Sequence, residues 1–184
     1  RYAAAGAVSH KELMTYRQKG SVLEGHPVPR FKFVDVATGS LGQGLSAGVG
    51  MALAAKADAL AYTTYVLIGD SESAEGSVWE AMELASFYKL GNLVAILDMN
   101  RLGQSRPTML EWDIEKYRAK AEAFGWRVID VDGHNMEDIL DAYGRIDPQS
   151  SEPTFIIAKT IKGKGVSFLE DKVEWHGIAL KEDE

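Results

Sequence analysis

The stretch from Val66 to Ser105 constrains the fold more than any other part of the chain. It alternates an apolar run, a polar turn, an amphipathic run and a second apolar run, which predicts strand, helix and strand. Asp70 follows the first apolar run and Asn100 follows the second. In an open parallel sheet, both residues would lie just beyond the C-terminal strand ends, where ligands bind. A carboxylate and an amide oxygen at that place suit Mg2+ or Ca2+ carrying a phosphate, and a simple turn is the alternative interpretation.

The same alternation continues towards the C-terminus. Periodicity and flanking turns predict strands at 63–68, 93–98, 126–131 and 153–159, and helices at 77–90, 114–124 and 136–143. The run at 93–98 is continuously apolar, as expected for a strand with helices on both faces of its sheet. We therefore predict a single α/β domain over residues 1–184, with a parallel sheet and helices on both faces.

The residues before the first strand are less regular. Ser9 and Glu12 form a capping box, which predicts a helix that ends at Gly20. Residues 21–40 form a connection so long that it should be either functional or disordered. This connection contains His26, which a solvated loop would also explain.

Residues 39–56 are rich in glycine and alanine, yet they carry helical spacing from Leu41 onwards. Glycine inside a helix costs ~1 kcal/mol relative to alanine. Such a cost indicates that another backbone or a ligand approaches this helix closely. Tight packing between helices is the other interpretation, and the sequence does not decide between them.

The segment Thr160–Gly165, TIKGKG, follows the last predicted strand. Lys162 and Lys164 should therefore reach the same edge of the sheet as Asp70 and Asn100. They could serve an anion there, or they could belong to a solvated loop. His176 lies in an irregular C-terminal segment, where a single histidine is uninformative by itself.

Composition excludes several classes of function. The formal net charge of −7 argues against a general nucleic-acid-binding surface. The absence of cysteine excludes disulfides, thiolate catalysis and zinc–thiolate sites, and it is typical of a reducing compartment, so we expect a cytoplasmic protein. No apolar run approaches the ~20 residues of a membrane span. Because the chain begins at Arg1 rather than at a methionine, we expect it to be a fragment or a subunit of something larger.

Eight short motifs carry a family resemblance. They are GHPVP, DVATGSLGQGL, EGSVWEAM, NLVAILDMNRLGQS, AFGW, VDGH, AKTIKGKG and WHG. They occur in the order of the N-terminal, pyrophosphate-binding domain of transketolase, a thiamine diphosphate enzyme, and at close to its spacing, and the chain therefore resembles that domain. The resemblance covers nearly the whole chain and implies the thiamine-diphosphate-binding fold.

The resemblance also assigns a metal site and a cofactor site. Asp70, the side chain of Asn100 and the carbonyl of Leu102 match Mg2+ ligands, with Ca2+ as the alternative ion. The metal would neutralise the cofactor's diphosphate, which supplies the remaining oxygens. A further set matches residues near the cofactor: Gly39, Ser40, Leu41, Ser71, Lys162 and His176.

His26 and His176 match the family's catalytic histidines, which face the reactive carbon and the sugar hydroxyls. An imidazole in such a place can donate to a developing alkoxide and move its proton. The resemblance thus implies that both histidines take part in the reaction.

The chain departs from the family pattern in two ways. Where the family has Gly-Asp-Gly, this chain has Ser71 in place of the second glycine. Serine keeps the N–H donor, but its Cβ would either crowd the diphosphate or require an uncomfortable φ. In addition, the family's upstream histidine-bearing segments and the glutamate of its pyrimidine-binding domain have no counterpart in these residues, so the chain resembles half of a site.

The implied reaction transfers a two-carbon ketol unit from a ketose phosphate to an aldose phosphate, as in the pentose phosphate pathway. We expect the isolated chain to be inactive and to need a pyrimidine-binding transketolase domain or subunit, in a homodimer or a heterotetramer. An apolar surface rich in residues such as those of Leu41–Leu53 should face that partner. The alternatives are a related enzyme, such as deoxyxylulose-phosphate or dihydroxyacetone synthase, and a non-catalytic α/β binding or assembly module. We expect neither nucleic-acid nor membrane partners.

Overall fold

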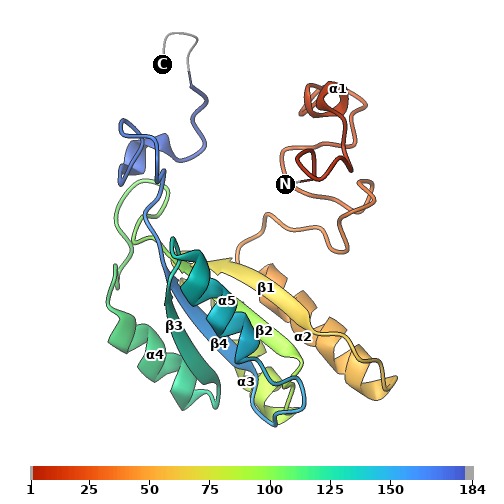
Figure 1. Ribbon diagram of the computed structural model, residues 1–184, viewed down its shortest axis with the longest axis vertical. Helices are drawn as coiled ribbons and strands as arrows, with labels where there is room; N and C mark the ends of the chain where they lie inside the picture. The colour runs from red at the N-terminus through yellow and green to blue at the C-terminus, as the bar shows by residue number, and fades with distance from the viewer. Residues whose placement is uncertain (1, 181–184) are drawn as a thin grey trace.

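Four parallel strands form the centre of the computed structural model, which describes residues 2–180 (Figure 1). They are β1 (Thr64–Gly69), β2 (Leu93–Met99), β3 (Arg127–Asp132) and β4 (Thr154–Lys159), in the spatial order β1-β2-β4-β3. The parallel register places Gly69 beside Asp98, and Asp98 beside Ala158. The turns after β1, β2 and β4 therefore all leave the sheet at the C-terminal ends of its strands, which we call the edge of the sheet. The parallel α/β fold predicted from the sequence is confirmed.

Helices cover the two faces of this sheet unequally. One face carries α2 (Gln43–Ala57), α3 (Gly76–Phe87) and α4 (Ile114–Ala123), and the other carries α5 (Met136–Gly144) (Figure 1). Leu45, Met82 and Tyr117 bring the first three helices into the larger apolar core. Ala142 of α5 belongs to the smaller core on the opposite face.

From the first strand onwards, the ends of the predicted elements lie close to the observed ones, and the largest difference there is at the end of α3. This helix ends at Phe87 rather than at residue 90. Lys89 adopts a left-handed φ of 53°, and Leu90 N–H donates to the Ala85 carbonyl at 3.0 Å. The chain thus turns out of the helix with its last carbonyls satisfied.

The glycines of α2 serve close packing at one identifiable position. A Cβ added to Gly48 would lie 2.4 Å from Cγ2 of Val66 on β1. Around Gly50, by contrast, such an atom would meet nothing within 4 Å. Helix-on-sheet packing therefore explains the glycine at residue 48.

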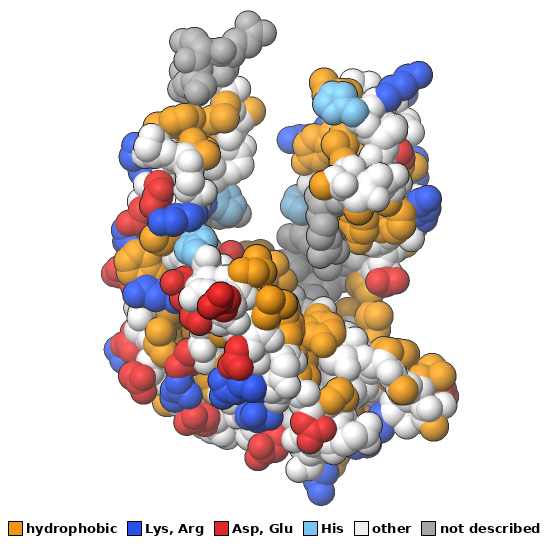
Figure 2. Space-filling model, in the orientation of Figure 1, with side chains coloured by type: hydrophobic (Ala, Val, Ile, Leu, Met, Phe, Trp, Pro, Cys, Tyr) orange, Lys and Arg blue, Asp and Glu red, His pale blue; other side chains and the backbone are white. Residues whose placement is uncertain are grey.

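Two irregular arms rise from the edge of the sheet where the strands end (Figure 1). The N-terminal arm comprises residues 2–38 and the C-terminal arm comprises residues 161–180, and the two stand apart above the body of the molecule (Figure 2). The C-terminal arm contains one short 3-10 turn, η2 (Val173–Trp175). None of the described helices combines the length and the apolar character needed to cross a membrane.

The helix of the N-terminal arm is much shorter than predicted. α1 covers His10–Leu13, and Ser9 Oγ accepts a hydrogen bond from Glu12 N–H at 3.1 Å, so the predicted cap is confirmed. The predicted end at Gly20 is wrong. Arg17 adopts a left-handed φ of 60°, and its N–H donates to the Leu23 carbonyl at 2.8 Å, so the chain folds back on itself before residue 20.

The apolar surface expected over Leu41–Leu53 is also mostly wrong. Leu45 is fully buried and Val49 is 7% exposed, because this side of α2 packs on β1 and α3, whereas Leu41 remains half exposed. The sheet instead exposes apolar side chains on the α5 face. Leu67 of β1, 69% exposed, lies there.

Candidate functional site

Asp70 lies directly after β1 and is almost completely buried, at 3% exposure. Ser71 N–H donates to its Oδ1 at 2.8 Å, and Arg101 N–H donates to its Oδ2 at 2.5 Å. Burial raises the pKa of Asp70 to about 6, although these two hydrogen bonds oppose the shift. Asp70 forms no salt bridge with any of residues 2–180. A buried carboxylate without a cation is costly when it is ionised, so this site is suited to a cation.

The loop after β2 brings two more oxygen atoms to this edge of the sheet. Asn100 Oδ1 accepts a hydrogen bond from Leu102 N–H at 3.0 Å and keeps a second lone pair. The loop is closed by a bond from Gly103 N–H to the Arg106 carbonyl at 2.9 Å. Within the described part of the chain, the carbonyl of Leu102 accepts no hydrogen bond. Both oxygens therefore have unused acceptor capacity.

These residues fit a metal ion only when other oxygens complete the coordination. The described residues contain no group of three or more His, Cys, Asp or Glu side chains that could hold a metal. An ion at this place would meet one carboxylate and two neutral oxygens, fewer than the six that Mg2+ requires. The donor set thus matches a metal that is held together with a diphosphate.

A cavity of about 480 Å³ opens beside Asp70. Leu41 lines it, which brings the end of the Gly39–Ser40–Leu41 stretch to the same space as Asp70 and Ser71. Gly103 and Tyr117 lie on its walls, and burial raises the pKa of the Tyr117 hydroxyl. The remaining lining residues are Ser73, Ala74, Trp79, Gln104, Ser105, Arg106, Pro107, Thr108, Met109, Leu110 and Lys120.

Ser71 occupies its position without backbone strain. Its φ is −69° and its ψ is −36°, an ordinary right-handed conformation at the start of the short 3-10 helix η1 (Glu72–Ala74). The backbone here therefore does not require the glycine of the family pattern. If serine lowers the affinity for the cofactor relative to glycine, the cause would be its Cβ in the cavity and not its backbone conformation.

Glu72 is a residue of the site that the sequence reasoning missed. Its Oε1 accepts a hydrogen bond from Gly42 N–H and its Oε2 accepts one from Gly69 N–H, each at 2.9 Å. One carboxylate thereby connects the loop before α2 to the end of β1. The motif shows a glutamate two residues after Asp70, but only the fold brings Gly42 to it.

His26 contacts the other end of the loop before α2. Gly39 has a φ of 126°, and a Cβ added to it would lie 2.7 Å from Cδ2 of the His26 ring. A side chain at residue 39 would thus meet both steric and backbone conflict. The fold therefore places one predicted catalytic histidine against the predicted cofactor loop.

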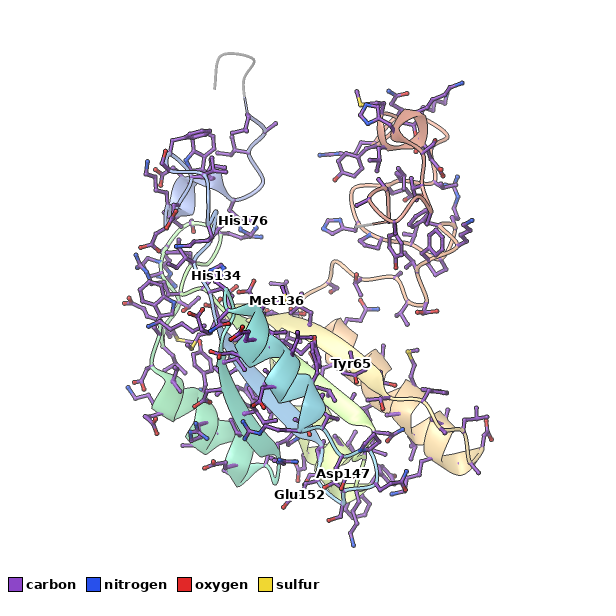
Figure 3. The ribbon with its side chains drawn as sticks, in the orientation of Figure 1. Tyr65, His134, Met136, Asp147, Glu152 and His176 are labelled. Carbon is purple, nitrogen blue, oxygen red and sulfur yellow. The ribbon has the colours of Figure 1, made fainter. Side chains whose placement is uncertain are left out.

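Lys162 and His176 lie together on the C-terminal arm. Lys162 Nζ is 3.1 Å from His176 Nδ1 and 3.5 Å from the carbonyl of Gly103. Burial lowers the pKa of Lys162, and the negative charge of Asp70 opposes this shift. Figure 3 shows His176 on this arm, above His134 at the sheet edge. Lys164, by contrast, forms an ion pair with Glu170, in which Nζ lies 3.4 Å from Oε1.

The fold does not bring His26 and His176 into contact. His26 belongs to the N-terminal arm and His176 to the C-terminal arm, which rise separately (Figure 1). Sequence reasoning also missed the ion pair between Arg101 and Asp171, at 2.5 Å. Its only sequence indication is that Arg101 immediately follows Asn100.

The fold and this edge define a class: an α/β domain with acidic, amide and carbonyl oxygens at adjacent strand ends, suited to a metal-bound diphosphate. The family model for the transketolase thiamine diphosphate-binding domain matches residues 5–184. The chain therefore belongs to the transketolase family, in its N-terminal thiamine diphosphate-binding domain.

Individual relatives agree with this assignment. The chain is 54% identical to human transketolase over 97% of its own length and 28% of that protein. It is 46% identical to one of the subunits of the apulose-4-phosphate transketolase of Phocaeicola vulgatus, over 94% of the chain and 62% of that relative. The crystal structure of transketolase from Campylobacter jejuni aligns with a TM-score of 0.83 at 35% identity, covering 90% of this chain and 27% of that one. The chain thus spans little more than a quarter of the length of the human and Campylobacter transketolases.

Proposed function

We propose that this chain provides the Mg2+- and diphosphate-binding half of a transketolase active site. The observation that carries the proposal is the state of Asp70, a buried carboxylate that forms no salt bridge with any of residues 2–180, close to the unused lone pairs of the Asn100 side-chain oxygen and the Leu102 carbonyl. Mg2+ with a diphosphate would supply the missing positive charge and the missing oxygen ligands together. The Gly39–Ser40–Leu41 stretch would lie against the thiamine.

The chain's other residues bind and orient the reactants. When bound, thiamine diphosphate supplies the carbanion chemistry that breaks one carbon–carbon bond and forms another. The ammonium group of Lys162 lies 3.5 Å from the carbonyl of Gly103, a residue of the cavity wall, and from there it can hold an anionic oxygen. His176 and His26 present ring nitrogens that can donate to sugar hydroxyls and carry their protons.

The proposed reaction is transfer of a two-carbon ketol unit from a ketose phosphate to an aldose phosphate. It requires a pyrimidine-binding domain, either on the same polypeptide or on a partner, in a homodimer or a heterotetramer. The name of the Phocaeicola relative describes a transketolase subunit, which supports a division of the enzyme between chains. The family supports placing the reaction in the pentose phosphate pathway, and the absence of cysteine supports a cytoplasmic location.

Calorimetry separates this proposal from a non-catalytic α/β module. Thiamine diphosphate should bind the chain in the presence of Mg2+ and bind far more weakly after the metal is chelated. Thiamine without phosphates is the matched control ligand and should not bind in a metal-dependent way. Equal binding with and without Mg2+, or no binding at all, would contradict the proposed site.

Reconstitution tests the reaction itself. The chain alone should not turn over sugar phosphates, whereas adding a complementary pyrimidine-binding domain should create ketol transfer. This activity should fall in both His26→Ala and His176→Ala. Robust turnover by the chain alone would overturn the half-site account. A preference for pyruvate as donor would favour the deoxyxylulose-phosphate synthase alternative.

A further inference from the structure

Arg101 contacts the metal half of the proposed site through its main chain. Its N–H donates to Asp70 Oδ2 at 2.5 Å, and its carbonyl accepts from Thr108 N–H at 2.8 Å. The residue adopts a left-handed φ of 66°, which is uncommon for a side chain of this size. The backbone therefore holds Arg101 at a fixed place beside Asp70.

The side chain of Arg101 points to a different part of the molecule. Its Nη2 lies 2.5 Å from Oδ2 of Asp171 on the C-terminal arm, and its Nη1 lies 3.7 Å from Oε2 of Glu111. The guanidinium also lies over the Trp112 ring, 4.9 Å from its centroid. Trp112 Nε1–H donates to the carbonyls of Met99 and Thr160, so this ring is anchored to the ends of β2 and β4. The Trp112 ring thus defines the plane on which the Arg101 guanidinium lies.

Asp171 in turn closes the loop that carries Lys162. Its N–H donates to the Lys162 carbonyl at 2.8 Å. Within this loop, Gly163 has a φ of 73° and packs against Leu169, where an added Cβ would lie 2.8 Å from the carbonyl oxygen. Lys162 then contacts His176 through its amine. A continuous series of contacts therefore leads from Asp70 through Arg101 and Asp171 to Lys162 and His176.

The ion pair is poorly arranged for stability alone. Arg101 Nε and Asp171 Oδ1 are buried, and neither has a hydrogen-bond partner among the described residues. The desolvation of these two atoms offsets part of what this partly exposed pair contributes to folding. Its value lies in geometry, because a planar guanidinium that stacks on an aromatic ring defines both a distance and a direction.

We propose that Arg101 and Asp171 form a positioning pair, which sets the place of Lys162 and His176 relative to the metal half of the site. This inference rests on the proposed function of those residues. Neither Arg101 nor Asp171 lines the cavity beside Asp70. The two side chains therefore act on the C-terminal arm, and on the reaction only by that route.

The test uses Arg101→Gln, Asp171→Asn and the double variant, in the full chain combined with its pyrimidine-binding domain. Each single variant should lower kcat for ketol transfer by on the order of 10- to 100-fold, because small misplacements of catalytic groups have effects of this size. The Kd for thiamine diphosphate with Mg2+ should rise by a smaller factor than the fall in kcat, because Asp70, Asn100 and Leu102 keep their places, and the double variant should match the singles, as for two residues of one contact. Glu170→Gln, which breaks the neighbouring Lys164–Glu170 pair, is the matched control and should keep its activity.

A second readout reports position without activity. In the full chain, the side-chain NMR resonances of His176 should shift in both single variants, while those of His26 on the other arm stay unchanged. Unmoved His176 resonances, additive losses in the double variant, or an equal loss of kcat in Glu170→Gln would overturn the positioning pair. Failure of the unmodified enzyme to bind cofactor or transfer ketol units would overturn the proposed function instead, and the resonances would still decide whether the pair positions the arm.

Discussion

The sheet edge around Asp70 and the two arms contribute to the same proposed site, but the fold holds them in very different ways. Asp70 and Leu102 are 3% and 6% exposed, and they lie in the turns after β1 and β2, which pair with each other and with β4 in a continuous parallel register. His26 and His176 are exposed and lie on segments with almost no regular structure. The proposed metal half therefore lies within the folded body of this chain, whereas the proposed histidine half depends on a few specific contacts and on any partner that packs against the arms.

The largest effect should come from breaking the metal half at its centre. Asp70→Ala should weaken Mg2+-dependent binding of thiamine diphosphate by at least about 100-fold, more than the loss of a residue that only supports a ligand. The metal-free fold should melt close to the wild type, because the substitution also removes a carboxylate that is costly to bury. Isothermal titration and thermal melting measure the two effects.

Asp132→Ala is the matched control for that substitution. Asp132 also ends a strand, but it lies on β3 and outside the cavity. Cofactor affinity that survives in Asp70→Ala, or that falls equally in Asp132→Ala, would refute the metal assignment.

The stability of the metal-free chain should also depend on pH through Asp70, the central residue of the proposed metal half. The folded chain holds a proton on Asp70 with a pKa of about 6, against 3.8 for the ordinary group. Between these values the folded state binds more protons than the unfolded state, so this group lowers the free energy of unfolding as pH rises. Asp70→Asn lacks the titration, and its stability relative to wild type should increase by up to about 3 kcal/mol from pH 4 to pH 8. Urea unfolding at both pH values checks this, and a constant difference would contradict the buried, unpaired state of Asp70.

These two halves also differ in how far the sequence could predict them. The alternation of apolar strands and amphipathic helices was sufficient to place Asp70 and Asn100 at neighbouring strand ends, because buried parallel strands appear in the sequence as short, strongly apolar runs. Periodicity does not encode contacts between distant loops, so the bridge from Glu72 to Gly42 was missed. The arms were predicted least well, since α1 ends at Leu13 and the chain turns back at Arg17 towards Leu23, and nothing in the local pattern marks that turn. The same limit applies to α2, whose apolar character is too uniform to show which side packs on the sheet.

Two glycines of α2 offer a direct test of the scaffold under the metal half. Gly48→Ala should destabilise the chain by about 1–3 kcal/mol, because its Cβ would overlap Val66 and the core would have to move. Gly50→Ala, in the same helix but in open space, should stabilise the chain by up to about 1 kcal/mol. Chemical denaturation of the pair gives the result. Equal effects of the two substitutions would contradict the close approach of α2 to β1.

Glu72→Gln should have a more moderate effect on the connection between the two loops. The amide retains one acceptor for Gly42 or Gly69 but turns a donor towards the other N–H. Loss of one hydrogen bond to a charged group corresponds to about 1.5–3 kcal/mol, so we expect cofactor binding to weaken by on the order of 10- to 100-fold at most. Glu83→Gln, on the exposed side of α3, is the control. Unchanged affinity in Glu72→Gln would mean that the loop before α2 keeps its place without this bridge.

Ser71→Gly should have the smallest effect, and it separates the two ways in which serine could matter. Because Ser71 already has an ordinary φ of −69°, glycine relieves no backbone strain and should lower stability by about 0.5–1 kcal/mol through the entropy of the unfolded chain. Removing the Cβ from the cavity wall should nevertheless let the diphosphate approach the backbone, with an increase in affinity of about 2- to 5-fold, or less than about 1 kcal/mol. Thermal melting and calorimetry on the same samples separate the two contributions. Affinity that is unchanged or lower would show that the serine side chain does not crowd the diphosphate, and that the metal half accepts it as readily as the glycine of the family pattern.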